Sequence, residues 1–351
     1  MQERANFFAE KLTLSCASTR EGANPHTDTL VYMPFRLPQL KLDPLIALIL
    51  TAVIIAIFFP ARGDFAEGFS VATKIAIALL FFLYGARLSP QEAVAGFKHW
   101  KLHATILSFT YLVFPLVGLA LFPLKYLLGN ELYLGLLYLM LVPSTVQSSV
   151  AFTSIARGNV PGAIVSASAS NLLGIVITPL LVMLLMGSGG IKISGNVFLD
   201  IAIQLLLPFV LGQLTRRFTA SFAKNHLVKQ IDRLSIAMVV YAAFSEGMVD
   251  GIWTRVSWWQ IIFLVALAVA LVEAMLWFTG FAGKKLGFTR EDCIAIQFCG
   301  TKKSLATGLP MAAVIFGGAG VGLLILPLMV FHQVQLMICA VRASKYAKDV
   351  A

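Results

Sequence analysis

The stretch Gly300-Thr301-Lys302-Lys303-Ser304 places two lysines at the centre of an apolar run, where a membrane helix is normally driest. A second apolar run is interrupted in the same way by Pro143-Ser144-Thr145-Val146-Gln147-Ser148-Ser149. The two runs, Cys293 to Phe316 and Tyr133 to Ala156, hold 24 residues each, so each could span about 36 Å as a helix. We therefore predict two membrane helices that are broken near their midpoints.

The composition of the chain is that of a helical membrane protein. Of its 351 residues, 58% are hydrophobic, and the mean hydropathy is +0.84. Long apolar runs recur along nearly the whole chain, which predicts an all-α polytopic protein surrounded by the lipid bilayer. The formal charge of +10 lies in short loops, so membrane topology accounts for it better than a nucleic-acid partner does. The four cysteines show no metal-ligand spacing, and we expect neither a metal nor a cofactor.

Ten membrane spans are predicted, and the loop charges set their orientation. The spans cover residues 44–60, 70–88, 103–123, 133–156, 160–186, 197–214, 232–249, 258–280, 291–317 and 321–342. With the amino terminus inside, seventeen basic residues fall in the inside segments and four in the outside loops. With an odd number of spans, the basic residues would no longer be concentrated on one side of the membrane. We therefore expect ten transmembrane helices with both termini cytoplasmic, in a bacterial plasma (inner) membrane.

The order of the spans predicts an inverted repeat. Five spans carry the chain to the opposite side of the membrane, so the second set of five begins there with inverted topology. The interrupted spans are the fourth and the ninth, which is the fourth position of each half. Direct identity between the halves is weak, and the repeat rests on order, spacing and topology. Interrupted helices in matching positions of two halves are the sequence feature that best indicates a transporter's binding site.

The first residues of the chain do not match the rest. Residues 1–32 are polar and lack the apolar core of a secretory signal. Either the true start is Met33, or this segment is a disordered cytoplasmic tail. We expect a tail over residues 1–41 and a transporter domain over residues 42–346.

Lys302 and Lys303 are the most costly residues to place in a membrane, at about 2.5–3.5 kcal/mol each on insertion scales. In one interpretation they mark a short surface turn between two re-entrant halves. In the other they hold positive charge at the midplane, supported by irregular backbone and by the dipoles of two half-helices. Adjacent helical residues point about 100° apart, so we expect one lysine to face the central site and the other to pair elsewhere.

Further polar residues lie at the same two interruptions or in the span after the first. A buried glutamine amide needs partners, whereas small hydroxyl residues also serve helix packing in membranes. The predicted substrate and ion-binding residues are Thr145, Gln147, Ser148, Ser149, Ser170, Asn171, Gln297, Thr301, Lys302, Lys303 and Ser304. Glu246 and Glu273, which lie in apolar spans, are candidates for ion coupling. For His332 and Gln333 we expect a satisfied core histidine rather than a ligand.

Enzyme motifs are missing from the sequence. It contains no phosphate-binding Gly-Lys-Ser/Thr loop, no His-Glu-x-x-His and no Gly-x-Ser-x-Gly. We therefore do not expect an enzyme.

At the two interrupted spans the sequence resembles the bile acid:sodium symporter family, and within it the SBF-like branch. The resemblance covers about Leu42 to Tyr346. It rests on Phe59-Pro60-Ala61-Arg62-Gly63-Asp64, Ala151-Phe152-Thr153-Ser154, Leu173-Gly174-Ile175-Val176-Ile177-Thr178-Pro179-Leu180 and, most specifically, Phe298-Cys299-Gly300-Thr301-Lys302-Lys303-Ser304-Leu305-Ala306. It implies a core domain (helices 3–5 and 8–10) and a panel domain (helices 1, 2, 6 and 7), with discontinuous helices 4 and 9 crossing where they unwind.

Only some of the family's sodium-binding residues have counterparts in this chain. Sodium-coupled relatives have a Ser-Asn pair after a Pro-Gly, and Ser148 and Ser149 after Pro143-Ser144 stand there in this chain. Their ninth helix has Glu-x-Gly-x-Gln-Asn, whereas this chain has Phe298 for the glutamate and Lys302-Lys303 for the Gln-Asn pair. Two sodium sites of the usual kind are therefore not expected. Our hypothesis is that a lysine ammonium occupies the place of a cation or carries the coupling proton.

The sequence therefore predicts a secondary active transporter, a symporter of a small organic anion that works by alternating access. Its coupling ion would be H⁺ or Na⁺. Two alternatives remain open, a cation/proton antiporter and a non-transporting membrane sensor or regulator.

Overall fold

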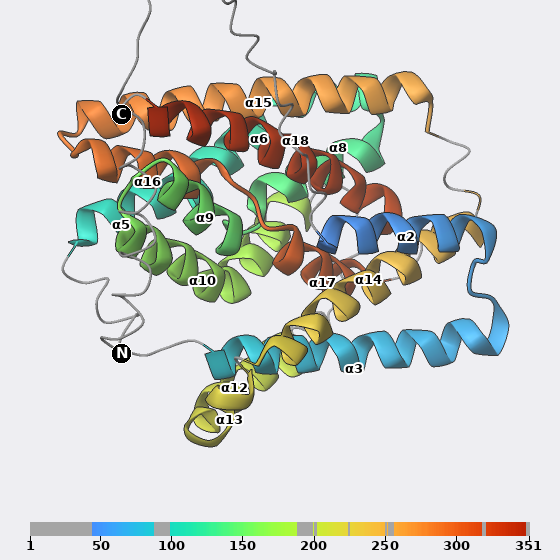
Figure 1. Cartoon of the computed structure of the whole chain (residues 1–351). Coiled ribbons are helices and arrows are strands. Elements are labelled where there is room, and N and C mark those ends of the chain that lie inside the picture. Colours follow the sequence, from blue (N-terminus) through green and yellow to red (C-terminus); the bar gives the residue numbers. More distant parts are fainter. Residues whose placement is uncertain are drawn as a thin grey trace, which may run out of the picture. The chain divides into compact units, whose positions relative to one another are not determined.

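The computed structural model describes residues 44–87, 99–187, 199, 202–223, 225–249, 251, 256–317 and 321–348, and its regular elements in these ranges are all helical (Figure 1). The predicted tail over residues 1–41 lies outside them. The described residues belong to one compact unit, residues 43–351.

The first part of this unit runs to residue 186. Its elements are α2 (Pro44–Phe58), α3 (Gly63–Arg87), α5 (Trp100–Ser108), the π-helix η2 (Phe109–Val113), α6 (Phe114–Ala120), the 3₁₀-helix η3 (Phe122–Leu124), α7 (Lys125–Leu128), α8 (Asn130–Leu141), α9 (Gln147–Ile155) and α10 (Val160–Met186).

The second part begins at residue 202. It contains the π-helix η5 (Ala202–Leu206), α12 (Leu207–Leu214), α13 (Arg216–Ala223), α14 (His226–Val249), α15 (Trp258–Lys285), α16 (Arg290–Thr301), α17 (Leu305–Phe316) and α18 (Val321–Lys348).

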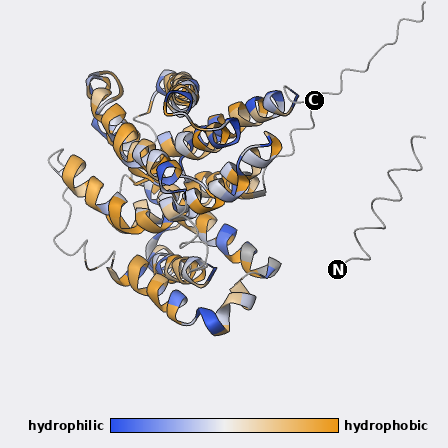
Figure 2. Ribbon diagram, turned by 90° about the vertical axis from the view of Figure 1, so that its left-hand side faces the viewer, coloured by the Kyte–Doolittle hydropathy of each residue, from blue (hydrophilic) through white to orange (hydrophobic). Residues whose placement is uncertain are grey.

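Helix length and hydropathy identify a multi-pass membrane protein. Five segments are long and apolar enough to cross a membrane, namely Gly63–Arg87, Trp100–Ala120, Val160–Met186, Trp258–Lys285 and Val321–Lys348. Shorter apolar helices cover Ala47–Phe58, Asn130–Leu141 and Ala202–Leu214. Hydrophobic residues dominate along most of the helices in Figure 2. The predicted all-α membrane architecture is therefore confirmed.

Within the described residues, each predicted span overlaps a helix, a run of helical segments or a pair of half-helices, and several boundaries differ. The second span begins at Gly63, the seventh begins at His226, and the eighth continues to Lys285. In each case the added turns contain polar residues. Backbone hydrogen bonding continues a helix past the apolar run, so hydropathy alone underestimates its length.

Both predicted interruptions are present. Helix α8 ends at Leu141 and α9 begins at Gln147; α16 ends at Thr301 and α17 begins at Leu305. At the first, Pro143 supplies no N–H and disfavours a helical residue before it, and Val142 is extended. At the second, Lys302 is extended and Ser304 caps α17 by accepting a hydrogen bond from Thr307 N.

Two glycines let α3 and α12 pack with their backbones nearly touching. A Cβ atom on Gly85 would lie 2.1 Å from the carbonyl oxygen of Phe209, and one on Gly212 would lie 2.0 Å from that of Phe82. Small residues at helix contacts permit this approach in membrane proteins. Figure 1 shows α12 beside the end of α3.

Around the interruptions, α8 packs on α18, and α15 packs on both α16 and α18. Large side chains fill the space between these helices, and Tyr138, Phe114, Phe298 and Phe331 are all fully buried. The second interruption and the first interruption up to Thr145 are therefore enclosed by a dense core.

Candidate functional site

The two interruptions meet at a backbone hydrogen bond. Ser304 N donates to the carbonyl oxygen of Pro143 across 2.8 Å. The hydroxyl of Ser144 donates to the carbonyl oxygen of Cys299 at 2.6 Å, and that of Ser149 donates to Phe298 at 3.1 Å. The first interruption is thus bonded to the end of α16 and to the start of α17.

Helix α10 connects the two interruptions through one asparagine. Asn171 Nδ2 donates to the carbonyl oxygen of Ser144 at 2.5 Å, and its Oδ1 accepts from the hydroxyl of Thr307 at 2.6 Å. One residue earlier in α10, Ser170 Oγ accepts from Ser144 N at 3.0 Å. Ser170 and Asn171, both predicted site residues, therefore lie at the meeting point of the half-helices.

Lys303 neutralises the carboxyl end of a half-helix. Its Nζ donates to the carbonyl oxygens of Met140 and Val142 at 2.9 Å each and to that of Thr110 at 3.1 Å. An ammonium has three donors, so all three are used. The last carbonyls of a helix carry partial negative charge and lack helical partners, and the π-helix around Thr110 offers the third carbonyl. Three carbonyl oxygens around one positive charge also form the kind of ligand set that holds a small cation.

The backbone of Lys303 is fixed as firmly as its side chain. The amide of Gln335 accepts from Lys303 N at 2.9 Å and donates to Lys303 O at 2.8 Å. Gln335 Nε2 also lies 2.8 Å from the Nδ1 atom of His332. His332 is buried within this group, as expected for a core histidine.

Lys302 has a different environment. Its Nζ lies 3.7 Å from the centroid of the Phe152 ring and 5.9 Å from that of Phe298. Among the described residues this nitrogen has no hydrogen-bond partner. Cation–π attraction offsets only part of the cost of burying a charge. The adjacent lysines are thus a fully bonded cation and an unpartnered one.

Neither ammonium faces solvent, since both lysines are 0% exposed. The expected 100° divergence of helical neighbours is wrong here, because Lys302 has an extended backbone. Within the described ranges the salt bridges are Arg87–Asp232 and Arg342–Glu273, so neither central lysine faces a carboxylate. No carboxylate in the described ranges therefore compensates the charge that either lysine carries when it is protonated.

The start of α9 presents polar groups outward. Gln147, the first residue of α9, is exposed, and Ser148 is half-buried. The hydroxyls of Thr145 and Ser148 lie 2.8 Å apart. The first N–H groups of a helix have no partners within it, so this end can bind a negatively charged or hydrogen-bond-accepting group.

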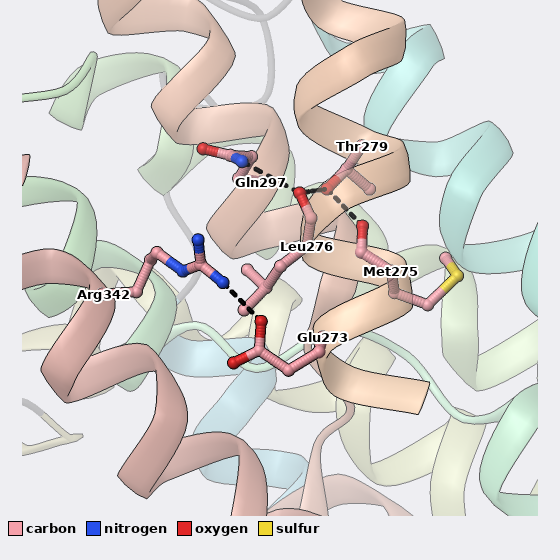
Figure 3. Close-up of polar contacts among 6 residues, drawn as sticks. All are labelled: Glu273, Met275, Leu276, Thr279, Gln297 and Arg342. Atoms are coloured by element: carbon pink, nitrogen blue, oxygen red, sulfur yellow. Dashed lines mark hydrogen bonds and ion pairs between the residues drawn. The ribbon is translucent and has the colours of Figure 1, made fainter. Parts of the chain in front are cut away.

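Gln297 and Thr301 face α15 and not the meeting point. Figure 3 shows the Gln297 amide donating to the carbonyl oxygen of Leu276, at 2.9 Å, while the Thr279 hydroxyl donates to Met275 at 2.6 Å. Thr301 Oγ1 lies 3.3 Å from Thr279 Oγ1. These two predicted site residues therefore join α16 to α15.

The two candidate coupling carboxylates lie on different helices. Glu273 on α15 forms an ion pair with Arg342 on α18 (Figure 3), which supplies the partner that its apolar surroundings require. Glu246 is half-buried near the end of α14. In the part of the chain that the structure describes, no group of three or more His, Cys, Asp or Glu side chains is placed to hold a metal ion.

Several residues of this network were missed by the sequence interpretation. They are Thr110, Tyr111, Thr307 and Gln335, all of which bond to residues at the interruptions or to their neighbours on α10. Gln335 was detectable as a second amide, beside Gln333, in an apolar span. The contribution of Thr110 comes from its backbone carbonyl, which no side-chain pattern reveals.

Comparisons with known proteins place these features in context. Residues 43–348 match the model of the SBF-like CPA transporter family. An uncharacterized protein of Pseudomonas aeruginosa, PA2026, is 46% identical, over 89% of this chain and 95% of its own length. The Escherichia coli protein named "Putative symporter YfeH" is also 46% identical, over 88% and 94%. The sodium/bile acid cotransporter 7 of Xenopus tropicalis is 31% identical, over 77% and 80%.

Proposed function

Because the chain belongs to the SBF-like CPA transporter family, we propose that it is a secondary active transporter that moves a small organic anion across a membrane by alternating access. The resemblance to the bile acid:sodium symporter family, drawn from Phe298 to Ala306 and three other motifs, is confirmed by the family match.

The observation that carries this proposal is the bonded meeting of two half-helix pairs, α8/α9 and α16/α17, at a centre with two buried ammonium groups. Unwound segments at the midplane are where such transporters bind substrates. We propose ten spans in two inverted repeats, with helices 3–5 and 8–10 as the core and helices 1, 2, 6 and 7 as the panel. The membrane would be a bacterial inner membrane, with both termini cytoplasmic.

An anionic substrate is supported by charge. The ammonium group of Lys303, joined by that of Lys302 whenever Lys302 is protonated, would make the centre positive, and no carboxylate within the described ranges pairs with either one. The exposed start of α9 adds free N–H groups and the Gln147 amide. A positive interior attracts anions over several ångströms even without direct contact. We therefore propose that the lysines set the electrostatic potential at the anion's site.

We further propose that the coupling ion is a proton carried by Lys302. Lys303 is fixed by six hydrogen-bonding atoms around its backbone and ammonium, whereas Lys302 Nζ has no acceptor within the described residues. An apolar surrounding favours the neutral amine, so a change of surroundings during transport can take up or release a proton there. Lys303 serves instead as a permanent cation in a carbonyl-lined site.

Two experiments test this function in sequence. A thermal-shift screen of small carboxylates, sulfonates and a bile acid, with and without sodium across pH, identifies a stabilising anion. Uptake of that anion into proteoliposomes is then driven either by a pH gradient or by a sodium gradient. We expect uptake driven by the pH gradient, which Lys302→Gln abolishes.

The alternatives give different results. Sodium-dependent uptake that survives both Lys302→Gln and Lys303→Gln would contradict the lysine hypothesis. Cation/proton exchange without anion binding would indicate an antiporter. A protein that responds to no solute but co-purifies with a partner would indicate a sensor or regulator.

A further inference from the structure

Helix α13 is a short helix that carries two strongly exposed aromatic residues. It has eight residues, Arg216–Ala223, and is therefore about 12 Å long, far short of the roughly 30 Å hydrocarbon core of a bilayer. Nevertheless Phe218 is 83% exposed and Phe222 is 62% exposed. Both rings lie beyond the end of the apolar segment Ala202–Leu214 and after the two arginines that begin α13, so that segment does not by itself account for their exposure.

The exposed rings form one stripe with the end of the preceding helix. Leu214, Phe218 and Phe222 are spaced four residues apart, which places them on one face of a helix. The turn that joins α12 to α13 keeps helical bonding, because Thr215 N donates to Leu211 O and Thr219 N donates to Thr215 O. The apolar stripe therefore continues directly from the apolar segment Ala202–Leu214.

The opposite side of α13 packs against α3 and α14. Ala223 is fully buried against Leu83, Ala86 and Val228. Its carbonyl oxygen accepts a hydrogen bond of 2.7 Å from Nε of Arg87, and Arg87 forms an ion pair with Asp232 of α14. The outward direction of the phenylalanines is thus fixed by contacts to α3 and α14.

Positive charge accompanies the apolar stripe. Arg216 and Arg217 begin the helix, and neither takes part in a salt bridge among the residues that the structure describes. In the sequence, the segment from residue 216 to residue 233 contains five basic residues, Arg216, Arg217, Lys224, Lys229 and Arg233, more than any other predicted inside loop. Helix α13 itself contains no acidic residue.

We infer that α13 is an interfacial helix that binds the anionic phospholipid headgroups of the adjacent leaflet. Phenylalanines at the depth of the acyl boundary and arginines at the phosphates are the arrangement by which short amphipathic helices bind membranes. Through Arg87 and Asp232, lipid binding holds the neighbouring ends of α3 and α14 at the membrane surface. This inference is independent of the transported substrate.

The test uses the full-length protein in neutral detergent, titrated with phosphatidylglycerol or with phosphatidylcholine while Tm is followed. We expect phosphatidylglycerol to raise the Tm by several degrees more than phosphatidylcholine. The double variant Arg216→Gln/Arg217→Gln should lose this difference and keep its Tm in phosphatidylcholine. The matched control is Lys284→Gln/Lys285→Gln, an exposed basic pair at the end of α15, which should keep the difference.

A second measurement addresses the rings. A polarity-sensitive dye on Phe222→Cys, read against labelled wild type in phosphatidylglycerol nanodiscs, should report an apolar surrounding. Water-like emission would overturn the inference, as would equal loss of the phosphatidylglycerol effect in the Lys284/Lys285 control. Cross-linking of Phe222→Cys between two copies in dilute nanodiscs would also overturn it, by showing that the stripe is a protein contact.

Discussion

The carbonyl oxygen of Pro143 accepts a hydrogen bond from the backbone N–H of Ser304, and this bond between the two interrupted helices uses main-chain atoms only. Proline provides the interruption on one side and cannot donate in return. On the other side, Ser304 is also the N-cap of α17. The same residue therefore starts a half-helix and ties it to the other interrupted span.

The first prediction separates these two functions of Ser304. Ser304→Ala removes the N-cap but keeps the N–H, and should cost about 1 kcal/mol of stability. Ser304→Pro also removes the N–H that reaches Pro143, and should cost an additional ~1–3 kcal/mol. Tm measured in detergent reports both. Equal Tm values for the two variants would show that the bond between the interruptions contributes nothing.

The second prediction compares how much each of the two adjacent lysines contributes to stability. Lys303→Met leaves three buried carbonyl oxygens without a donor and should lower stability by about 3 kcal/mol or more. Lys302→Met removes a buried polar nitrogen that lacks a hydrogen-bond partner in the described chain, and should raise stability by about 1 kcal/mol. The readout is Tm, and Lys345→Met, at an exposed position of α18, is the control for net charge. Changes of the same sign at both lysines would contradict the assignment.

The third prediction concerns sodium. If the Lys303 ammonium occupies a cation's place, sodium chloride should not raise the Tm of the wild type above its value in N-methylglucamine chloride. Lys303→Ala empties the space between the carbonyls of Met140, Val142 and Thr110, so sodium should stabilise this variant in a saturable manner. Lys303→Ser serves if the alanine variant does not fold. Lys302→Ala, which opens no such carbonyl set, should gain nothing.

The fourth prediction tests the connection through α10. Asn171→Leu keeps the size of the side chain but removes its bonds to Ser144 and Thr307, and should cost about 2–3 kcal/mol. Ser154→Ala, at an exposed position on α9, should leave Tm within the error. A tolerated Asn171→Leu would show that the half-helices hold their places without α10.

The fifth prediction tests the close contact of α3 and α12. Gly85→Ala would place a methyl group 2.1 Å from a backbone oxygen, so the helices must separate and Tm should fall by many degrees. Gly68→Ala on the same helix meets nothing within 4 Å, and should be neutral or stabilising because alanine favours helix by about 1 kcal/mol. Similar Tm values for these two variants would exclude the proposed packing.

The sequence was sufficient to predict both interruptions, because a proline or a lysine in an apolar run conflicts with an unbroken membrane helix. It also indicated Ser170 and Asn171, which are polar residues in an apolar span. It could not distinguish Lys302 from Lys303, because their directions depend on an extended backbone at Lys302 that periodicity does not reveal. The direction of Gln297 toward α15 was equally hidden, since hydrophobic residues surround these helices and leave no polar face to orient them.

A cation that is covalently attached to its site has a consequence for energetics. Lys303 cannot leave with the substrate, so its charge adds nothing to the free energy that a gradient supplies in each cycle. If a mobile ion occupied the same carbonyl set and crossed with the substrate, its concentration gradient would raise the ratio of internal to external substrate. A tethered ammonium does not add this contribution, and transport then does not depend on the external concentration of such an ion. With one proton per cycle, each pH unit across the membrane would sustain roughly a tenfold accumulation of substrate. Under the proposed mechanism, the ammonium held by the three carbonyls would make transport independent of external sodium and would lower the substrate accumulation that it can reach.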